Sequence, residues 1–227
     1  MLIWLVLIPL IAAALIGLCK APARPTALLS ASLTLALGIW ALVSFDGCSS
    51  CWSRFEGMDL QLTLAPALSK VMLLLTILVT FATVLGTNPP QGGEASWYNS
   101  ALLISAGATG AFLSDNIISF FAFHELALIP TFVMIGLYGR GDRRTTAWRA
   151  TLYLGLASMV LLAALLMIGT QAGFTFSGLK DFMASGRELA HAELIGALLI
   201  AGFGTLISLF PFHSWAAPAY ASAPAPV

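Results

Sequence analysis

The chain has 227 residues, of which 59% are apolar and only 9% are charged. Average soluble domains carry roughly 25% charged residues, so this composition excludes a water-soluble globular protein and indicates that lipid surrounds most of the chain. Ten basic and ten acidic residues give a formal net charge of zero, which argues against a nucleic-acid-binding surface. We therefore predict an all-α integral membrane protein without a soluble domain large enough for conventional catalysis.

The first apolar segment, Met1–Leu18, is interpreted as a membrane span that the protein keeps. Lys20 and Arg24 follow the apolar run, and no basic residue precedes it. Because a signal peptide carries its positive charge before the apolar run, cleavage here is the less favoured interpretation.

Seven apolar stretches are close to the length needed to cross the membrane, since a hydrocarbon core about 30 Å thick takes about 20 helical residues. Turn-forming segments rich in glycine, proline and charge separate them. The predicted spans, which form a single bundle with a helix break near Pro211, are Leu2–Leu18, Ala27–Phe45, Pro66–Leu85, Tyr98–Leu113, Ile117–Tyr138, Trp148–Gly169 and Leu194–Pro211. Only Ser114–Asn116 separates the fourth span from the fifth, which predicts that these two are antiparallel neighbours.

Two of the connecting segments carry further predictions. Thr170–Glu193 is the longest, and a short surface helix is expected in it. Gly47–Asp59 is marked by turn signals and includes Cys48 and Cys51, in a C-S-S-C arrangement. Two loop thiols or a local disulfide are the favoured interpretation, and a redox or metal pair is the alternative. The nearest histidine, His124, lies in another span, so no metal site is predicted.

Basic residues in the short loops predict the orientation of the chain. The loop after the first span carries Lys20 and Arg24, and the loop after the fifth carries Arg140, Arg143 and Arg144. Because cytoplasmic loops are enriched in lysine and arginine, both loops are predicted to be cytoplasmic and the N-terminus to lie outside.

Glu125 is the strongest candidate for a functional residue. It lies inside the fifth span, in F-F-A-F-H-E-L-A-L-I-P-T-F, and ionisable groups at such positions are costly and usually functional. A carboxyl group there is protonated, faces a hydrated cavity or pairs with a cation. We predict that Glu125 relays protons. The alternative is a neutral glutamic acid that hydrogen-bonds another helix.

Two other ionisable residues are weaker candidates. His124 lies about 100° around the helix from Glu125, so the two need not share a face. A neutral His124 that donates to a backbone carbonyl is favoured over a proton carrier. Lys70 lies early in the third span, where it can extend to the membrane surface or act as a buried partner.

Prolines mark two places where helices are expected to open. Pro130 has no N–H, so the carbonyl of Leu126 loses its helical partner. The opening either admits water beside Glu125 or is a tolerated kink. Pro211 is expected to break the seventh span, and His213 follows it. Because broken helices at membrane depth line cavities, His213 is a candidate site residue.

Two motifs resemble those of a known family. The string F-F-A-F-H-E-L-A-L-I-P-T-F-V-M-I-G-L-Y-G at Phe120–Gly139 resembles the fifth span of the antiporter-like subunits of respiratory complex I, the chain M type above all. The family pattern is an aromatic run, Glu, L-[IV]-P and a span that ends in W/Y-G. Glu125 falls on its essential glutamate. The string F-P-F-H-S-W-A-A-P-A-Y-A-S-A-P-A-P-V at Phe210–Val227 is similar to the segment around the family's discontinuous seventh helix.

The resemblance implies a fold and a mechanism. The fold has about fourteen helices in two inverted repeats, each with a broken helix, and this chain corresponds to its N-terminal half. Proton transfer in the family couples a glutamate on helix five to a lysine on helix seven, where this chain has Leu206. Tyr220 likewise replaces a family histidine.

The resemblance also implies cofactors, partners and location. No redox cofactor is expected in this chain, since flavin and iron–sulfur clusters belong to other subunits. The expected partners are the other membrane-arm subunits and protons. The expected location is the plasma (inner) membrane of a bacterium, or alternatively an organellar energy-transducing membrane.

Three functions follow from these observations. The favoured one is a membrane subunit of proton-translocating NADH:quinone oxidoreductase, with a proton pathway through Glu125. The second is a subunit of a multi-subunit cation/proton antiporter or membrane-bound hydrogenase. The third is a non-pumping membrane scaffold, because Leu206 replaces the lysine.

Overall fold

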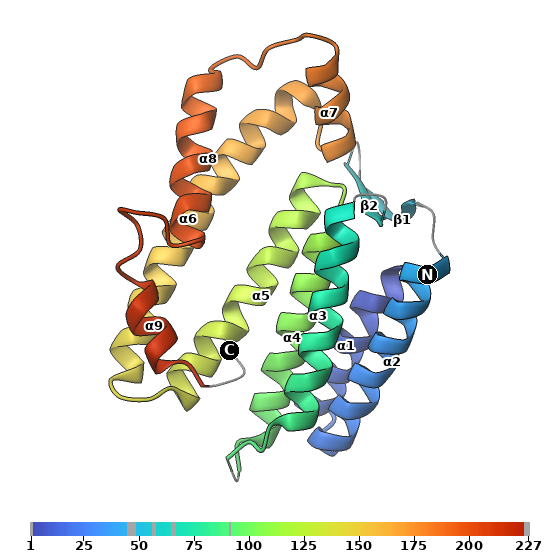
Figure 1. Ribbon diagram of the computed structural model, residues 1–227, viewed down its shortest axis with the longest axis vertical. Helices are drawn as coiled ribbons and strands as arrows, with labels where there is room; N and C mark the ends of the chain where they lie inside the picture. Colours follow the sequence, from blue (N-terminus) through green and yellow to red (C-terminus); the bar gives the residue numbers. More distant parts are fainter. Residues whose placement is uncertain (1, 45–48, 56–57, 65–66, 91, 225–227) are drawn as a thin grey trace. The chain divides into compact units, whose positions relative to one another are not determined.

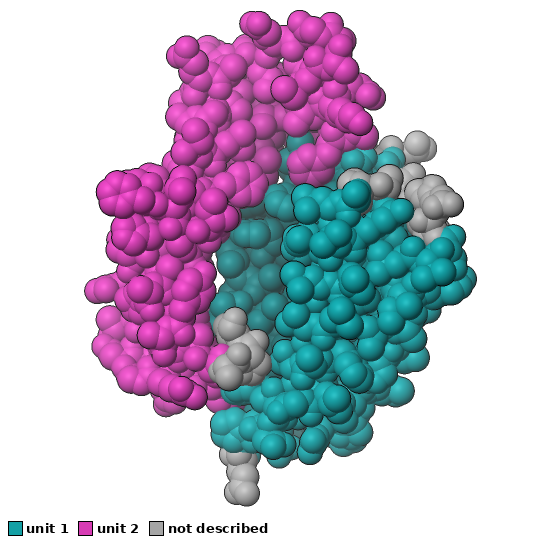
Figure 2. Space-filling model, in the orientation of Figure 1, with its two compact units in different colours: residues 1–131, 226 teal, residues 132–225, 227 magenta. Residues whose placement is uncertain are grey.

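The computed structural model describes residues 2–44, 49–55, 58–64, 67–90 and 92–224. Within these ranges the chain forms nine helices and one two-stranded sheet (Figure 1). It divides into two compact units, one up to Thr131 and the other from Phe132 onwards, coloured teal and magenta in Figure 2. The boundary falls inside one helix, between Thr131 and Phe132.

The first unit is a helical bundle with a small hairpin. Its elements are α1 (Leu2–Gly17), α2 (Ala23–Ser44), β1 (Ser49–Phe55), β2 (Met58–Thr63), α3 (Ala67–Gly86), α4 (Glu94–Leu113) and the first part of α5 (Ile117–Tyr138). Helix α1 packs against α2 and α4, and α3 packs against the same two helices. Their core is built from aliphatic side chains, including Leu5, Val6, Leu73 and Ile77.

Small residues let these helices approach closely, as is usual in membrane bundles. A Cβ atom on Gly38 of α2 would lie 2.6 Å from Cδ1 of Ile77 in α3, so a larger residue there would require the Ile77 side chain to shift. A polar contact links the next pair of helices, because Oγ1 of Thr80 donates to Oγ of Ser105 at 2.9 Å.

The α4–α5 pair confirms the predicted antiparallel neighbours. Gly110 faces the ring of Phe123, and Gly107, one turn earlier in α4, faces Ala127, one turn later in α5. Asn116 fixes the start of α5, since its Oδ1 accepts from the backbone N–H groups of Ile118 at 2.8 Å and Ser119 at 3.2 Å. This is the arrangement of a helix N-cap.

The structure adds one element to the predicted all-α fold, a β-hairpin formed by Ser49–Phe55 and Met58–Thr63. Strands β1 and β2 pair antiparallel, with Ser49 opposite Thr63 and Phe55 opposite Met58. The hairpin is attached to the α4–α5 turn, because the N–H of Asp115 donates to the carbonyl of Gln61 at 3.0 Å. Cys51 belongs to β1 and Cys48 lies outside the described residues, so the interpretation of this pair stays a prediction.

The second unit contains the last part of α5, together with α6 (Arg143–Ala172), α7 (Phe176–Ala184), α8 (Ala192–Leu206) and α9 (Ala216–Ser222). Helix α6 is the central helix of this unit, and α7, α8 and α9 all pack against it. A Cβ on Gly202 of α8 would lie 2.9 Å from Cβ of Leu161, so α6 and α8 meet at close range. Helix α7 confirms the short helix expected in Thr170–Glu193. Thr175 caps it by accepting from the N–H of Gly178 at 3.1 Å.

The long helix α6 begins earlier than the predicted Trp148. Asp142 is its N-cap, and Oδ1 accepts from the N–H of Thr145 at 3.3 Å. The hydropathy pattern missed this first turn because Arg143 and Arg144 are charged, although a capped helix tolerates charge at its end.

The break in the seventh predicted span is present, but the helix ends at Leu206 rather than near Pro211. Ser208 adopts the left-handed conformation, with φ of 61°. The N–H of Leu209 donates to the carbonyl of Gly204 at 2.7 Å, and that of Ser208 to Thr205 at 3.1 Å. These two bonds form a Schellman motif, which terminates the helix before the proline is reached.

Helices occur at all seven predicted stretches. Four of them, α2, α3, α5 and α6, are long and apolar enough to cross a membrane, and α1 and α8 are shorter apolar helices. Large aliphatic side chains of α3, including Leu68, Val71 and Leu75, are exposed, as a lipid-facing surface requires. The structure therefore supports a membrane location, and the number of spans stays a prediction.

Candidate functional site

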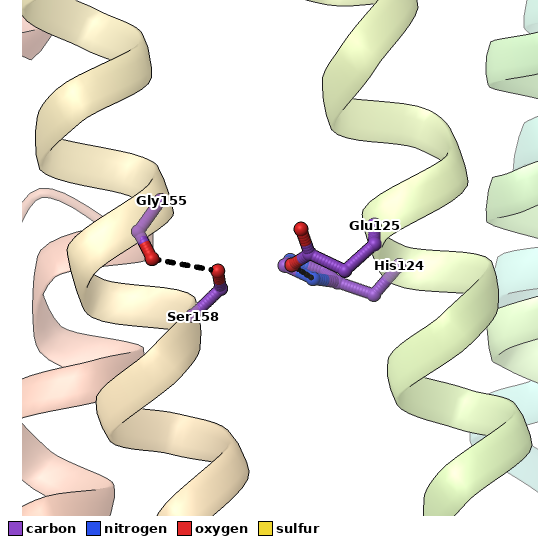
Figure 3. A network of polar contacts seen from close by, with 4 residues as sticks. All are labelled: His124, Glu125, Gly155 and Ser158. Atoms are coloured by element: carbon purple, nitrogen blue, oxygen red, sulfur yellow. Dashed lines mark hydrogen bonds and ion pairs between the residues drawn. The ribbon is translucent and has the colours of Figure 1, made fainter.

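The candidate site lies on α5, within the first unit. Phe123 of this helix is buried in the core formed with α1 to α4, which fixes the rotation of this part of α5. His124 and Glu125 follow directly, and their side chains are 22% and 29% exposed. Figure 3 shows the imidazole and the carboxyl group on the same side of the helix.

His124 and Glu125 are in contact, although their backbone positions differ by about 100° around the helix. Nδ1 of His124 lies 3.4 Å from Oε1 of Glu125. This separation is within ion-pair range when the histidine is protonated, and it is longer than an ordinary N–H···O hydrogen bond of about 2.7–3.2 Å. Helical spacing alone does not require the two residues to share a face, and in the structure their side chains turn toward each other.

Both atoms of this pair are buried without a hydrogen-bond partner among the described residues. The donation from His124 to a backbone carbonyl that the sequence analysis favoured is therefore not found at Nδ1. The ring of His124 is stacked on that of Phe120, with centroids 6.3 Å apart and planes at 25°. Since buried polar atoms nearly always have a partner, these two atoms are available to a water molecule or a second polar group.

Pro130 lies within α5, which continues through it to Tyr138. Because proline has no N–H, the carbonyl of Leu126 receives no helical hydrogen bond from position 130. One residue further on, Oγ1 of Thr131 donates to the carbonyl of Ala127 at 2.9 Å. A backbone carbonyl that lacks its usual i+4 donor thus lies one residue after Glu125.

Two other candidates are not joined to Glu125. Lys70 is half-buried in the first turn of α3, and no ion pair between it and Glu125 occurs in the described part of the chain. His213 is exposed in the connection between α8 and α9, with its ring 5.6 Å from that of Phe210. It belongs to the second unit, whereas Glu125 belongs to the first.

The helix break in the second unit is held by a residue that the sequence analysis did not select. Nε1 of Trp215 donates to the carbonyl of Thr205 at 2.9 Å, in the last turn of α8. The neighbouring Ser214 donates from Oγ to the hydroxyl of Tyr153 at 3.1 Å. A tryptophan after a predicted helix break was the available signal, because buried indole N–H groups need an acceptor.

Leu206, at the position of the expected lysine, is the last residue of α8 and is half-buried. No group of three or more His, Cys, Asp or Glu residues that could hold a metal ion occurs in the ranges that the structure describes.

Comparison with known proteins identifies the family. Residues 114–227 match the family described as "NADH:quinone oxidoreductase/Mrp antiporter, TM". Subunit M of the F(420)H(2) dehydrogenase of Methanosarcina mazei is 24% identical, over 97% of this chain and 48% of its own length. A NAD(P)H-quinone oxidoreductase chain 4 of Microcystis aeruginosa is 31% identical, over 70% of this chain and 29% of its own.

Solved structures show the same fold. A chain of respiratory complex I from Thermus thermophilus superposes with a TM-score of 0.85 at 25% identity, over 98% of this chain and 47% of that one. A chain of the Mrp complex from Dietzia sp. superposes with a TM-score of 0.78 at 22% identity, over 96% and 43%. This chain thus spans about half the length of these relatives or less. The family match begins at the turn before α5 and includes Glu125 and the broken helix, so the chain belongs to the NADH:quinone oxidoreductase/Mrp antiporter family as an antiporter-like membrane subunit.

Proposed function

We propose that this chain is a membrane subunit of a proton-translocating NADH:quinone oxidoreductase and that Glu125 relays protons through it. The observation that carries the proposal is the buried Oε1 of Glu125, which lies 3.4 Å from Nδ1 of His124 and has no hydrogen-bond partner among the described residues. A carboxyl group in an apolar helix is costly, and such groups are characteristic of proton pathways.

The surroundings of Glu125 support a relay in which its carboxyl group takes up and releases a proton. His124 supplies a second side chain that can carry a proton, with Nδ1 3.4 Å from Oε1 of Glu125. The carbonyl of Leu126, which receives no hydrogen bond from Pro130, offers an acceptor for a water molecule that brings or removes the proton. Each step needs only groups within or next to the His124–Glu125 pair.

The proposal extends to the assembly in which the chain works. The relatives are named as subunits or chains of quinone oxidoreductases and a dehydrogenase, so we assign other membrane-arm subunits as partners. The chain spans 47% of the complex I chain, and we propose that it corresponds to one half of a fourteen-helix inverted-repeat fold. We propose that it binds no redox cofactor, lies in a bacterial plasma membrane and has its N-terminus outside.

The test is proton transport by the intact complex in inverted membrane vesicles, driven by NADH and followed with a pH-sensitive dye. Glu125→Gln keeps the size of the side chain but cannot ionise, and we expect it to lower the rate through this subunit by about a hundredfold or more. Glu125→Asp should restore part of it. Glu94→Gln, at an exposed position in the first turn of α4, is the matched control and should transport normally. Unchanged transport in Glu125→Gln would remove the proposal.

A cation/proton antiporter is the second candidate, because the family description names the Mrp antiporter and an Mrp chain has the same fold. This function predicts that a sodium gradient alone drives proton movement, without NADH or quinone. Vesicles that contain the complex would acidify or alkalinise on addition of sodium, and Glu125→Gln would abolish the response.

A non-pumping scaffold is the third candidate, and Leu206 is the observation that favours it. The family lysine is absent from the end of α8, so the carboxyl group lacks the partner that the resemblance implies. Our preferred proposal predicts that Leu206→Lys raises the transport rate, with Leu206→Met as a control of similar size. A scaffold would transport no protons in either variant and would be indifferent to Glu125→Gln.

A further inference from the structure

The second unit contains a groove that the proton-relay proposal does not use. It has a volume of about 410 Å³ and lies between the end of α5 and the beginning of α6. Its lining residues are Phe132, Val133, Gly136, Leu137, Arg143, Arg144, Ala147 and Trp148. We call it the α5–α6 groove. Both helices are among the four that are long and apolar enough to cross a membrane, and the groove lies at the connection between them.

The inner wall of the groove is apolar and ordered. The rings of Phe132 and Trp148 pack edge to face, with centroids 5.5 Å apart and planes at 62°. Trp148 is 53% exposed, and aromatic side chains of this kind are enriched where membrane meets water. Gly136 leaves space in the wall of the groove. A Cβ atom there would make only an ordinary van der Waals contact, at 3.6 Å from Cβ of Ala147.

The rim of the groove is basic, because Arg143 and Arg144 line it. The one carboxylate between positions 140 and 149, Asp142, accepts from the N–H of Thr145 as the cap of α6. Nη1 of Arg143 donates to the carbonyl of Leu137 at 2.6 Å, which anchors its guanidinium group at the groove. A guanidinium group has five N–H donors, so this bond leaves others for a ligand. Arg144 is exposed beside it.

We propose that the α5–α6 groove binds an anionic phospholipid. Arg143 and Arg144 hold the phosphate of the headgroup, and an acyl chain lies against Phe132, Val133 and Leu137. Guanidinium groups bind phosphate through paired, charge-assisted hydrogen bonds, and basic pockets between membrane helices are characteristic headgroup sites. The charge of the rim and the apolar wall together match a lipid, which carries phosphate and hydrocarbon at this depth. The proposal does not depend on proton transfer at Glu125.

The test uses the intact complex in phosphatidylcholine nanodiscs that contain a small fraction of photoactivatable phosphatidylglycerol. After irradiation and pepsin digestion, mass spectrometry measures the label on peptides from residues 132–148. Pepsin is chosen because the arginine substitutions remove trypsin sites. Photoactivatable phosphatidylcholine measures labelling by a neutral headgroup, and added inorganic phosphate tests whether a free anion competes.

The matched variants are two double substitutions with the same change of charge. Arg143→Gln with Arg144→Gln changes the groove, whereas Arg140→Gln with Arg149→Gln changes arginines of the same segment that do not line it. We expect the first pair to lower labelling about tenfold or more, because charge-assisted hydrogen bonds are lost. The second pair should lower it less than about twofold, as exposed charges do. Gly136→Leu keeps every charge, fills the groove and should also abolish labelling. This variant tests the groove independently in case the double arginine variant does not fold.

Each remaining outcome would overturn the proposal. Equal labelling by the neutral lipid, or equal losses in the two double variants, would mean that no specific headgroup site exists. Full competition by inorganic phosphate would identify an anion site without a lipid. Labelling elsewhere but never at residues 132–148 would show that a partner subunit covers the groove in the complex.

Discussion

Nδ1 of His124 lies 3.4 Å from Oε1 of Glu125 on the membrane helix α5. Both atoms are buried, and neither has a hydrogen-bond partner among the described residues. Histidine and glutamate side chains can both carry a proton. The pair therefore places two proton-binding side chains in contact on one helix.

The first prediction concerns His124 itself. His124→Ala should lower the rate of proton transport by about tenfold without abolishing it, because Glu125 remains but loses the proton-binding side chain in contact with it. His191→Asn is the control, since His191 is exposed and adopts a left-handed conformation that asparagine tolerates. The measurement is the initial rate of NADH-driven proton transport in vesicles, and equal rates in His124→Ala and wild type would refute a role for the pair.

The second prediction concerns the close contact between α4 and α5. A Cβ atom on Gly107 would lie 2.7 Å from the backbone oxygen of Phe123 and 2.8 Å from the backbone nitrogen of Ala127, and backbone atoms cannot turn aside. Gly107→Ala should therefore destabilise the protein by about 1–3 kcal/mol, the usual cost of overpacking. Gly196→Ala meets nothing within 4 Å and serves as the control. Thermal unfolding of the purified complex would measure the stability of both variants. Equal unfolding midpoints for Gly107→Ala and Gly196→Ala would show that the α4–α5 contact does not require glycine at position 107.

The third prediction concerns the bond across the break in the second unit. Trp215→Phe keeps a buried ring but removes the donor to the carbonyl of Thr205, which should cost about 1 kcal/mol. Backbone amides between Ile207 and Trp215 should then exchange hydrogen with solvent several times faster. The same substitution at Trp40, which is 54% exposed on α2, should leave their exchange unchanged. If these amides exchange as slowly in Trp215→Phe as in the wild type, the prediction is contradicted, and the Schellman motif alone holds this segment.

The positions of the helices were predictable from the sequence, whereas several of their ends were not. Long apolar runs locate helices such as α5, whose predicted bounds equal the observed ones. The ends of α6 and α8 depend on single polar contacts instead. Asp142 extends α6 into a charged segment, and the left-handed Ser208 ends α8 before Pro211. The β1–β2 hairpin was missed because the glycine and charge of its segment were interpreted as turn signals.

The candidate site was predictable in part for a similar reason. A glutamate within an apolar helix stands out in the sequence, so Glu125 was found, but its contact with His124 depends on side-chain rotation rather than on helical spacing. Trp215 was missed because its partner is a backbone carbonyl at Thr205, which no sequence pattern marks. Arg143 and Arg144 were used only as indicators of orientation, although the structure adds a groove beside them.

The central claim is that Glu125 gains and loses a proton during turnover, and infrared difference spectroscopy of the intact complex tests it most directly. Spectra recorded with and without NADH and quinone report the C=O stretch of carboxylic acids, which exists only in the protonated form. We predict a carboxylic acid band that changes during turnover in the wild type and in Glu94→Gln, shifts in Glu125→Asp and is absent from Glu125→Gln. A band that persists unchanged in Glu125→Gln would contradict the account, because the proton would then be carried by another group.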